Sequence, residues 1–230
     1  MQLNRKHAIG AAAAALIAIP AAAQQAPQWY VGFGGGKSKT SDDIVDQRES
    51  AIVNGSATGS TFDDSDGAFK AFGGWQVNDI FALEAYYADL GRTHLVTNTV
   101  SASAGLPGTF DMKRRVDGFG LDGLVRGNFA RGFSVFARAG AFASRVRGDA
   151  TVSGSLVFVS DPTVTSKSNS VSKTVAHYGV GGEWAFQPNT ALRLEYERFD
   201  KMGKAFAVGD TGTTGEASTD LVSLSLLMRF

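Results

Sequence analysis

The stretch GVGGEWAFQPNTALRLEYERF, residues 179–199, alternates apolar side chains with small or charged ones on either side of a short Gln-Pro-Asn segment. Successive side chains of a β-strand point to opposite faces, so this alternation predicts two strands joined by a turn at 187–189. One face carries Tyr178, Val180, Trp184 and Phe186 before the turn and Leu192, Leu194 and Tyr196 after it. The other face carries His177, Glu183, Arg193 and Glu195. The stretch therefore predicts a β-hairpin with one apolar and one charged face.

The same period-two pattern recurs in eight segments of about 10 residues, the length of a tilted membrane-spanning strand. They are residues 28–38, 67–77, 81–90, 119–126, 133–140, 177–186, 192–196 and 222–230. Three connections are short, at 78–79, 128–132 and 187–189, and four are long, near 39–66, 91–112, 148–173 and 200–218. We therefore expect an all-β fold: a transmembrane antiparallel up-and-down β-barrel of eight strands. Three short periplasmic turns, four long extracellular loops and two periplasmic termini complete the expected topology.

A soluble β-sandwich would also contain many short alternating strands, and it would expose its charged faces to water, so the alternation alone leaves that fold open. The asymmetry of the connections favours the barrel, as does the run of alternating apolar residues that closes the chain at Phe230. An N-terminal export signal favours it as well.

That signal occupies residues 1–23, which have the layout of a secretory signal peptide. Arg5 and Lys6 precede an unbroken small-apolar run at 8–19, and three alanines at 21–23 suit signal peptidase. The run is shorter than the roughly 20 apolar residues needed to span a bilayer. We therefore expect cleavage before Gln24 and a single exported domain at 24–230.

The composition of the mature chain excludes several classes of function. Two of the 22 basic residues and none of the 22 acidic ones lie in the signal segment, which leaves 20 against 22 and a formal charge of −2. A nearly neutral chain argues against nucleic acid as a partner. The chain has no cysteine, which excludes disulfides and thiolate metal sites.

Taken together, these segments resemble the OmpA-type eight-stranded outer-membrane β-barrel family. The resemblance is carried by WYVGFGGGKSK at 29–39, AFGGWQVNDIFALEAYYADLGR at 71–92, FSVFARAGAF at 133–142, the hairpin at 179–199, and Phe230. It implies an integral protein of the Gram-negative outer membrane, and Phe230 resembles the signal read by the barrel-assembly machinery. The chain stops at the barrel, so we expect no peptidoglycan-binding domain and no role as a wall tether.

An eight-stranded barrel has an interior that side chains can fill. Here the inward faces would carry four cations and four carboxylates: Lys70, Arg126, Arg138 and Arg193 with Glu84, Asp122, Glu183 and Glu195. If the turn at 187–189 is centred on Pro188, Glu183 lies opposite Arg193. If the turn at 128–132 is centred on Ala130, Asp122 lies opposite Arg138. Because buried charges are tolerated when they are paired, we expect a polar plug.

The family resemblance implies an internal network that includes Glu84, Glu183, Arg138 and Arg193. Such a network is sometimes discussed as a gate, so a small gated conductance is the alternative to a permanent plug.

On the outward face, four cations would lie near the extracellular ends of the fourth and fifth strands: Lys113, Arg115, Arg145 and Arg147. The hairpin centre at Ala130 sets Arg115 opposite Arg145 and Lys113 opposite Arg147. Cations at one level could bind the phosphates of lipopolysaccharide, since arginine pairs bidentately with phosphate. Ordinary anchoring of the barrel rim by cations is the equally open alternative.

The expected loops offer little specific chemistry. The first is acidic, and DDSD at 63–66 has oxygen ligands but lacks the glycine and distal glutamate of an EF-hand, so we expect a solvated loop and neither metal nor cofactor. The Ser/Thr/Val-rich segment 149–175 could stand above the membrane and contact a host surface or a phage.

Two catalytic readings fail on the residues present. GGGKS at 34–38 lacks the first glycine of a P-loop, because Val31 stands in its place. Barrel lipid A deacylases use a His-x-Ser pair for acyl transfer, and here His177 is followed by Gly179 where the serine would be. We therefore expect a non-enzymatic, monomeric outer-membrane protein that supports envelope integrity and surface interaction. A narrow gated diffusion channel and a loop-based adhesin or receptor are the alternatives.

Overall fold

The computed structural model describes residues 28–41, 53–101, 105–205 and 214–230. The expected signal peptide and four acidic residues of the first loop, Asp42, Asp43, Asp46 and Glu49, lie outside these ranges. The strands are β1 (Gln28–Thr40), β2 (Gly55–Asp63), β3 (Ser65–Gln76), β4 (Phe81–Ser101), β5 (Pro107–Ala130), β6 (Phe133–Gly154), β7 (Ser166–Gln187), β8 (Thr190–Lys204) and β9 (Gly215–Arg229). Across the described ranges, no helix is both long and apolar enough to cross a membrane.

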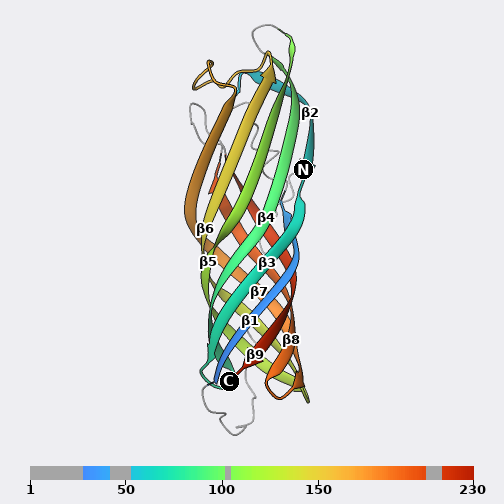
Figure 1. Ribbon diagram of the computed structural model, residues 1–230, viewed down its shortest axis with the longest axis vertical. Coiled ribbons are helices and arrows are strands. Elements are labelled where there is room, and N and C mark those ends of the chain that lie inside the picture. Colours follow the sequence, from blue (N-terminus) through green and yellow to red (C-terminus); the bar gives the residue numbers. More distant parts are fainter. Residues whose placement is uncertain (1–27, 42–52, 102–104, 206–213) are drawn as a thin grey trace, which may run out of the picture.

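The strands form one closed antiparallel sheet. Their order is β2-β4-β3-β1-β9-β8-β7-β6-β5, and a further pairing of β4 with β5 closes the ring. Only Asp64 separates β2 from β3, and both pair with β4, so the two occupy one position and the ring has eight positions. Figure 1 shows the resulting tall barrel. The predicted all-β antiparallel barrel is confirmed.

Each of the eight predicted segments coincides with one strand, apart from Val77 and Phe230, which lie one residue beyond β3 and β9, but most strands are longer than predicted. β4, β5, β6 and β7 contain 21, 24, 22 and 22 residues. They take up most of the regions predicted as long loops at 91–112 and 148–173, and β2 lies within the loop predicted at 39–66. β2 and β4 to β7 consequently rise above the rest of the ring, at the end opposite the C-terminus (Figure 1).

The barrel divides into two parts along its axis. The turn-side barrel carries the turns at 77–80, 131–132 and 188–189 and both ends of the described chain, where the Phe230 amide bonds the Trp29 carbonyl at 3.0 Å. The loop-side barrel consists of β2, residues 92–101 of β4, 107–116 of β5, 145–154 of β6 and 166–174 of β7.

Strand β6 runs through both parts and shows how they differ. Its outward side chains are apolar from Phe133 to Ala143 and polar from Arg145 to Ser153. Its inward face changes in the opposite sense, from Arg138 in the turn-side barrel to apolar residues such as Val152 in the loop-side barrel. The loop-side interior contains a separate apolar core, to which the neighbouring connections and β9 also contribute: Val53, Leu95, Phe110, Met112, Ala150, Val152, Leu156, Phe158 and Ala217.

Two β-bulges explain why the sequence pattern stops short of the true strand ends. One lies in β4 between Asp89 and Arg92, and the other in β8 between Phe199 and Met202. A bulge inserts a residue and moves later side chains to the opposite face, which interrupts a period-two pattern. Gly91 adopts a φ of 81° at the first bulge, and a Cβ there would stand 2.7 Å from the Gly67 carbonyl oxygen. The strand therefore continues where its periodicity appears to end.

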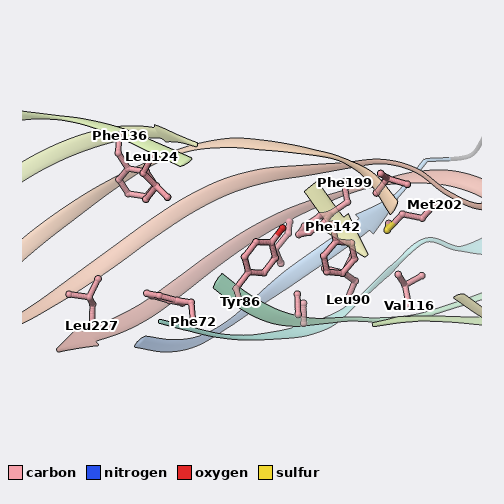
Figure 2. Close-up of a cluster of buried hydrophobic side chains, with 14 of the residues drawn as sticks. Phe72, Tyr86, Leu90, Val116, Leu124, Phe136, Phe142, Phe199, Met202 and Leu227 are labelled. Carbon is pink, nitrogen blue, oxygen red and sulfur yellow. The ribbon is translucent and has the colours of Figure 1, made fainter. Parts of the chain in front are cut away.

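Inward glycines in the turn-side barrel make room for aromatic rings. Tyr30 lies opposite Gly74 and Tyr86 opposite Gly120, and a Cβ on either glycine would stand 2.1 Å from the facing ring. Figure 2 shows rings from several strands, including Phe72, Tyr86 and Phe136, gathered inside the barrel. The interior is thus packed with side chains.

Candidate functional site: the charged lumen

All eight charged residues predicted for the lumen point inward in the turn-side barrel. Lys70 comes from β3, Glu84 from β4, Asp122 and Arg126 from β5, Arg138 from β6, Glu183 from β7, and Arg193 and Glu195 from β8. Seven of them are at most 3% exposed, and Arg126 is half-buried at the turn end. Strand alternation places them there, because each shares parity with the other inward residues of its strand.

Arg193 connects two carboxylates in the part of the network nearer the turns. Its guanidinium lies 2.5 Å from Glu84 and 2.7 Å from Glu183. Arg126 and Arg229 bind the other oxygen of Glu183. Glu183 is thus held by three guanidinium groups.

Arg138 occupies the centre of the network. Its guanidinium lies 2.6 Å from Asp122, 2.9 Å from Glu84 and 2.7 Å from Glu195. Lys70 donates to Glu195 at 2.6 Å from the opposite side. These contacts join residues of five strands across the lumen, so the network crosslinks the barrel through its interior.

Three members of this network were not among the eight predicted residues. Glu197 is fully buried and lies 2.8 Å from Lys70 and 3.3 Å from Arg138. His177 lies between two carboxylates, with Nδ1 at 2.8 Å from Asp122 and Nε2 at 3.3 Å from Glu197. Arg229 is the third. Glu197 shares the parity of Arg193 and Glu195 on β8, and this signal was sufficient to find it.

With these additions the network contains equal numbers of permanent charges. The cations are Lys70, Arg126, Arg138, Arg193 and Arg229, and the carboxylates are Glu84, Asp122, Glu183, Glu195 and Glu197. Aromatic faces cover the remaining surface of the arginines. The Arg193 guanidinium lies 4.5 Å from the centre of the Phe72 ring, and that of Arg138 lies 5.0 Å from Tyr86. Cation–π contact of this kind stabilises buried guanidinium groups.

The strand register corrects one of the two predicted pairings. Glu183 faces Arg193 across β7 and β8, as the sequence analysis predicted. Asp122 faces Gly140 instead, and Arg138 faces Leu124, because the turn is centred one residue later, at Arg131. The ion pair between Arg138 and Asp122 forms nevertheless as a diagonal contact, which long side chains can reach.

At the turn end the lumen opens into a cavity of about 910 Å³. Arg126, Glu183 and Arg229 line it together with Phe129 and Phe133 of the neighbouring strands. The charge network therefore begins directly behind this mouth.

The four outward cations do lie on the outer face, but their cross-strand partners differ from the prediction. Arg115 faces Arg147, and the same shift of the turn centre sets Lys113 opposite Asp149 and Arg145 opposite Asp117. Two of the four form ion pairs along the outer face. Arg115 lies 2.5 Å from Asp89, and Arg147 lies 2.6 Å from Asp117.

Lys113 and Arg145 are exposed and form no ion pair within the described part of the chain. All four cations mark the level at which the outer face changes from apolar to polar. Phe230 is 71% exposed at the turn end, and its role as an assembly signal stays a prediction.

Comparison with known proteins agrees with this architecture. The family model of the OmpA-like transmembrane domain matches residues 24–230. No curated protein sequence matches the chain. Among solved structures, the attachment invasion locus protein Ail of Yersinia pestis is 14% identical, with 90% of this chain and 100% of that chain covered and a TM-score of 0.48.

Neisserial surface protein A is 15% identical over 90% of this chain and 100% of its own, with a TM-score of 0.46. The outer membrane protease OmpT of Escherichia coli is 9% identical over 89% of this chain and 96% of its own, with a TM-score of 0.41. Because the family model spans the entire barrel, the chain belongs to the OmpA-like transmembrane domain family and is an outer-membrane β-barrel protein.

Proposed function

We propose that this protein is a non-enzymatic outer-membrane barrel with a plugged lumen, which supports the integrity of the envelope and presents its loop-side strands to the outside. The observation that carries the proposal is the buried charge network. Each of its five cations contacts at least one carboxylate, and the network joins strands from opposite sides of the ring. A lumen filled with paired side chains in this way favours a closed barrel over a channel that solutes can pass.

The position of His177 supports the non-enzymatic part of the proposal. Its imidazole is buried inside the lumen, hydrogen-bonded to Asp122 and stacked on Phe199 with ring centres 4.3 Å apart. Lipid would contact the opposite face of the sheet. An assay for release of acyl chains from lipopolysaccharide by the purified protein tests this part, and we expect no release.

Single-channel recording of the refolded protein in planar bilayers tests the plug. We expect no steady conductance from the wild-type barrel. Arg193 holds Glu84 and Glu183 together, so Arg193→Ala should permit openings that the wild type lacks. A steady wild-type conductance that Arg193→Ala abolishes would contradict the plug and identify Arg193 as part of a pore.

A narrow gated channel is the second candidate, and the bonding of Arg138 favours it. Its guanidinium lies within 3.3 Å of four carboxylates: Glu84, Asp122, Glu195 and Glu197. A cation with several partners can exchange one for another at little cost. Brief voltage-dependent openings in the wild type, with a frequency changed by Arg138→Lys, would support gating over a permanent plug.

A surface role is proposed for the loop-side barrel. The outward face of β7 in this part is rich in serine and threonine, with Ser168, Ser170, Ser172 and Thr174 exposed. Such a polar surface suits water, and the connection between β6 and β7 directly precedes it in the chain. Replacing residues 159–163, which are exposed or half-buried, with a Gly-Ser segment leaves Leu156 and Phe158 of the core in place, and measuring adhesion to host cells or phage adsorption then tests an adhesin or receptor role. Unchanged adhesion and phage adsorption would contradict an adhesin or receptor role for this connection.

Contact with lipopolysaccharide is proposed for the four outward cations. Lys113 and Arg145 are the stronger candidates, because Asp89 and Asp117 already neutralise Arg115 and Arg147. Replacing all four with alanine should reduce the lipopolysaccharide that copurifies with the barrel. Arg131→Ala removes an exposed cation at the turn end and serves as the control. If equal amounts of lipopolysaccharide copurify with the quadruple variant and with Arg131→Ala, the four cations only anchor the barrel rim in the membrane.

A further inference from the structure

One cation of the lumen differs from all the others. Arg114 points inward from β5 in the loop-side barrel and is 1% exposed. Its Nη2 atom donates to the main-chain oxygen of Met202 at 3.0 Å. Nε and Nη1 are both buried and have no hydrogen-bond partner within the described chain. Arg114 is therefore a buried guanidinium with one carbonyl as its hydrogen-bond acceptor.

The five cations of the charge network all have carboxylate partners. Arg138 and Arg193 each contact several carboxylates, and even half-buried Arg126 and Arg229 bind Glu183. Those five are matched by five carboxylates, whereas Arg114 forms no ion pair within the described part of the chain. A guanidinium keeps its charge at neutral pH, so Arg114 cannot avoid this position by losing a proton.

The surroundings of Arg114 are apolar. Met112 and Val116 flank it on the inward face of β5, and both are buried. Figure 2 places Val116 and Met202 near one end of the interior cluster, with Phe142 and Phe199 beside them. Within the described part of the chain, the one hydrogen bond of the Arg114 side chain goes to the Met202 main chain and none goes to a carboxylate. An isolated charge in such a place is strongly unfavourable unless a counter-ion or polar partner is close.

Thr93 supplies a second polar group at the same level. It is the cross-strand partner of Arg114 on β4, and its side chain is buried on the same inward face. A threonine hydroxyl can donate to an anion, as can Nε and Nη1 of an arginine. On the other side, the cross-strand partner of Arg114 is Gly148 of β6, which has no side chain.

We propose that Arg114 and Thr93 form a binding site for a small inorganic anion of the halide class inside the loop-side lumen. Buried polar groups without a protein partner are commonly explained by an ion or an ordered water. The positive charge selects an anion, and the buried side chains of Met112 and Val116 beside Arg114 favour a small one. The bound anion neutralises Arg114, which itself joins β5 to the bulge of β8 through Met202. The site thus couples the stability of the loop-side barrel to anions in the medium.

Anion-dependent unfolding of the refolded barrel tests the proposal. The urea midpoint is measured at increasing sodium chloride, with sodium gluconate added to hold the ionic strength constant. A ligand that binds only the folded state stabilises it in a saturable manner, so the wild-type midpoint should rise with chloride and reach a plateau. In Arg114→Met the rise should be absent. Arg145→Met removes an exposed arginine of the outer face and should keep the wild-type response.

Two results of that titration would overturn the proposal. One is a wild-type midpoint that does not change with chloride, and the other is an equal rise in Arg114→Met. Because Arg114→Met could fold poorly, a measurement on the wild type stands beside it. Crystals grown in sodium bromide should show an anomalous scattering peak beside Nε or Nη1 of Arg114. Bromide at the protein surface alone, with water or nothing at Arg114, would overturn the site.

Discussion

The turn-side and loop-side barrels are built from the same strands but have opposite polarity. In the turn-side barrel the outer face is apolar, with exposed residues such as Phe119 and Leu121, and the interior holds paired charges. In the loop-side barrel the outer faces of β5, β6 and β7 are charged or hydroxylated, and the interior contains an apolar core around Phe110. The surroundings of the strand explain the difference. Lipid requires an apolar outer face, whereas water allows the usual burial of apolar side chains inside.

The difference shows that strand pairing is independent of which face is apolar. β5 and β6 pair continuously from Gly108 with Gly154 down to Asn128 with Ser134. Hydrogen bonding between main chains holds both parts together, while the side chains adapt to their surroundings. Four stability experiments test whether the two parts differ in this way, and the expected loss of stability decreases from one to the next.

Removing a central cation of the turn-side lumen should have the largest effect. Arg138→Met leaves Asp122, Glu195 and Glu197 with fewer partners inside a buried network. Breaking a buried ion pair by removing one partner costs about 3–5 kcal/mol. The urea midpoint of the refolded barrel, followed by tryptophan fluorescence, should fall accordingly. A wild-type midpoint for Arg138→Met would mean that the network does not stabilise the barrel.

Placing a lysine on the outer face should distinguish the two parts directly. Ala139 and Thr151 both point outward from β6 and are exposed, one in each part. Lysine on a lipid-facing position near the bilayer midplane costs about 2–4 kcal/mol, so Ala139→Lys should be clearly destabilising. Thr151→Lys should stay within about 0.5 kcal/mol of the wild type, as surface substitutions usually do. Equal losses in bilayer unfolding experiments would contradict the division.

Filling the space that Gly120 leaves for the Tyr86 ring should lower the free energy of unfolding by a smaller amount than Arg138→Met or Ala139→Lys. In Gly120→Ala the new Cβ would stand 2.1 Å from the Tyr86 ring, so the ring must move within a packed interior. Overpacking of this kind costs about 1–3 kcal/mol. Gly123 lies on the same strand with nothing within 4 Å of its Cβ position, so Gly123→Ala is the matched control. If both variants unfold at the same urea concentration, the interior is not packed as described.

Breaking an ion pair of the outer rim should have the smallest effect. The side chains of Arg115 and Asp89 are 43% and 23% exposed, so water screens the pair. Exposed ion pairs contribute about 0–1 kcal/mol, and Arg115→Met should change the urea midpoint far less than Arg138→Met does. A loss as large as that of Arg138→Met would show that the rim, and not the lumen, holds the barrel together.

Sequence periodicity was sufficient to predict the turn-side barrel. Every second residue faces lipid there, so segments such as 28–38 and 133–140 show their alternation without interruption. The eight charges of the lumen followed from the same parity. Glu197 was missed although its parity matched, because the predicted segment ended at Tyr196.

The loop-side barrel could not be predicted in the same way. Its polarity is reversed, and the bulges after Asp89 and Phe199 shift the parity, so an apolar-out pattern finds no strand there. Serine- and threonine-rich strands such as β2 also have the composition of loops. The predicted register between β5 and β6 was wrong because its turn was centred on Ala130, one residue too early. Nothing in residues 128–132 determines which of them lies at the centre of the turn. Arg114 escaped notice because its isolation depends on contacts across the lumen.

Spin labelling along the outer face of β6 locates the level at which this face passes from lipid to water, and a chain without native cysteine is suited to it. Single cysteines at 135, 139, 143, 147 and 151 are spin-labelled in liposomes. Their accessibility to oxygen, which concentrates in lipid, is then compared with that to a water-soluble nickel complex. We predict that oxygen dominates from 135 to 143 and the nickel complex at 147 and 151. Oxygen-dominated accessibility at 151, or nickel-dominated accessibility at 139, would contradict the reversal of polarity between the turn-side and loop-side barrels.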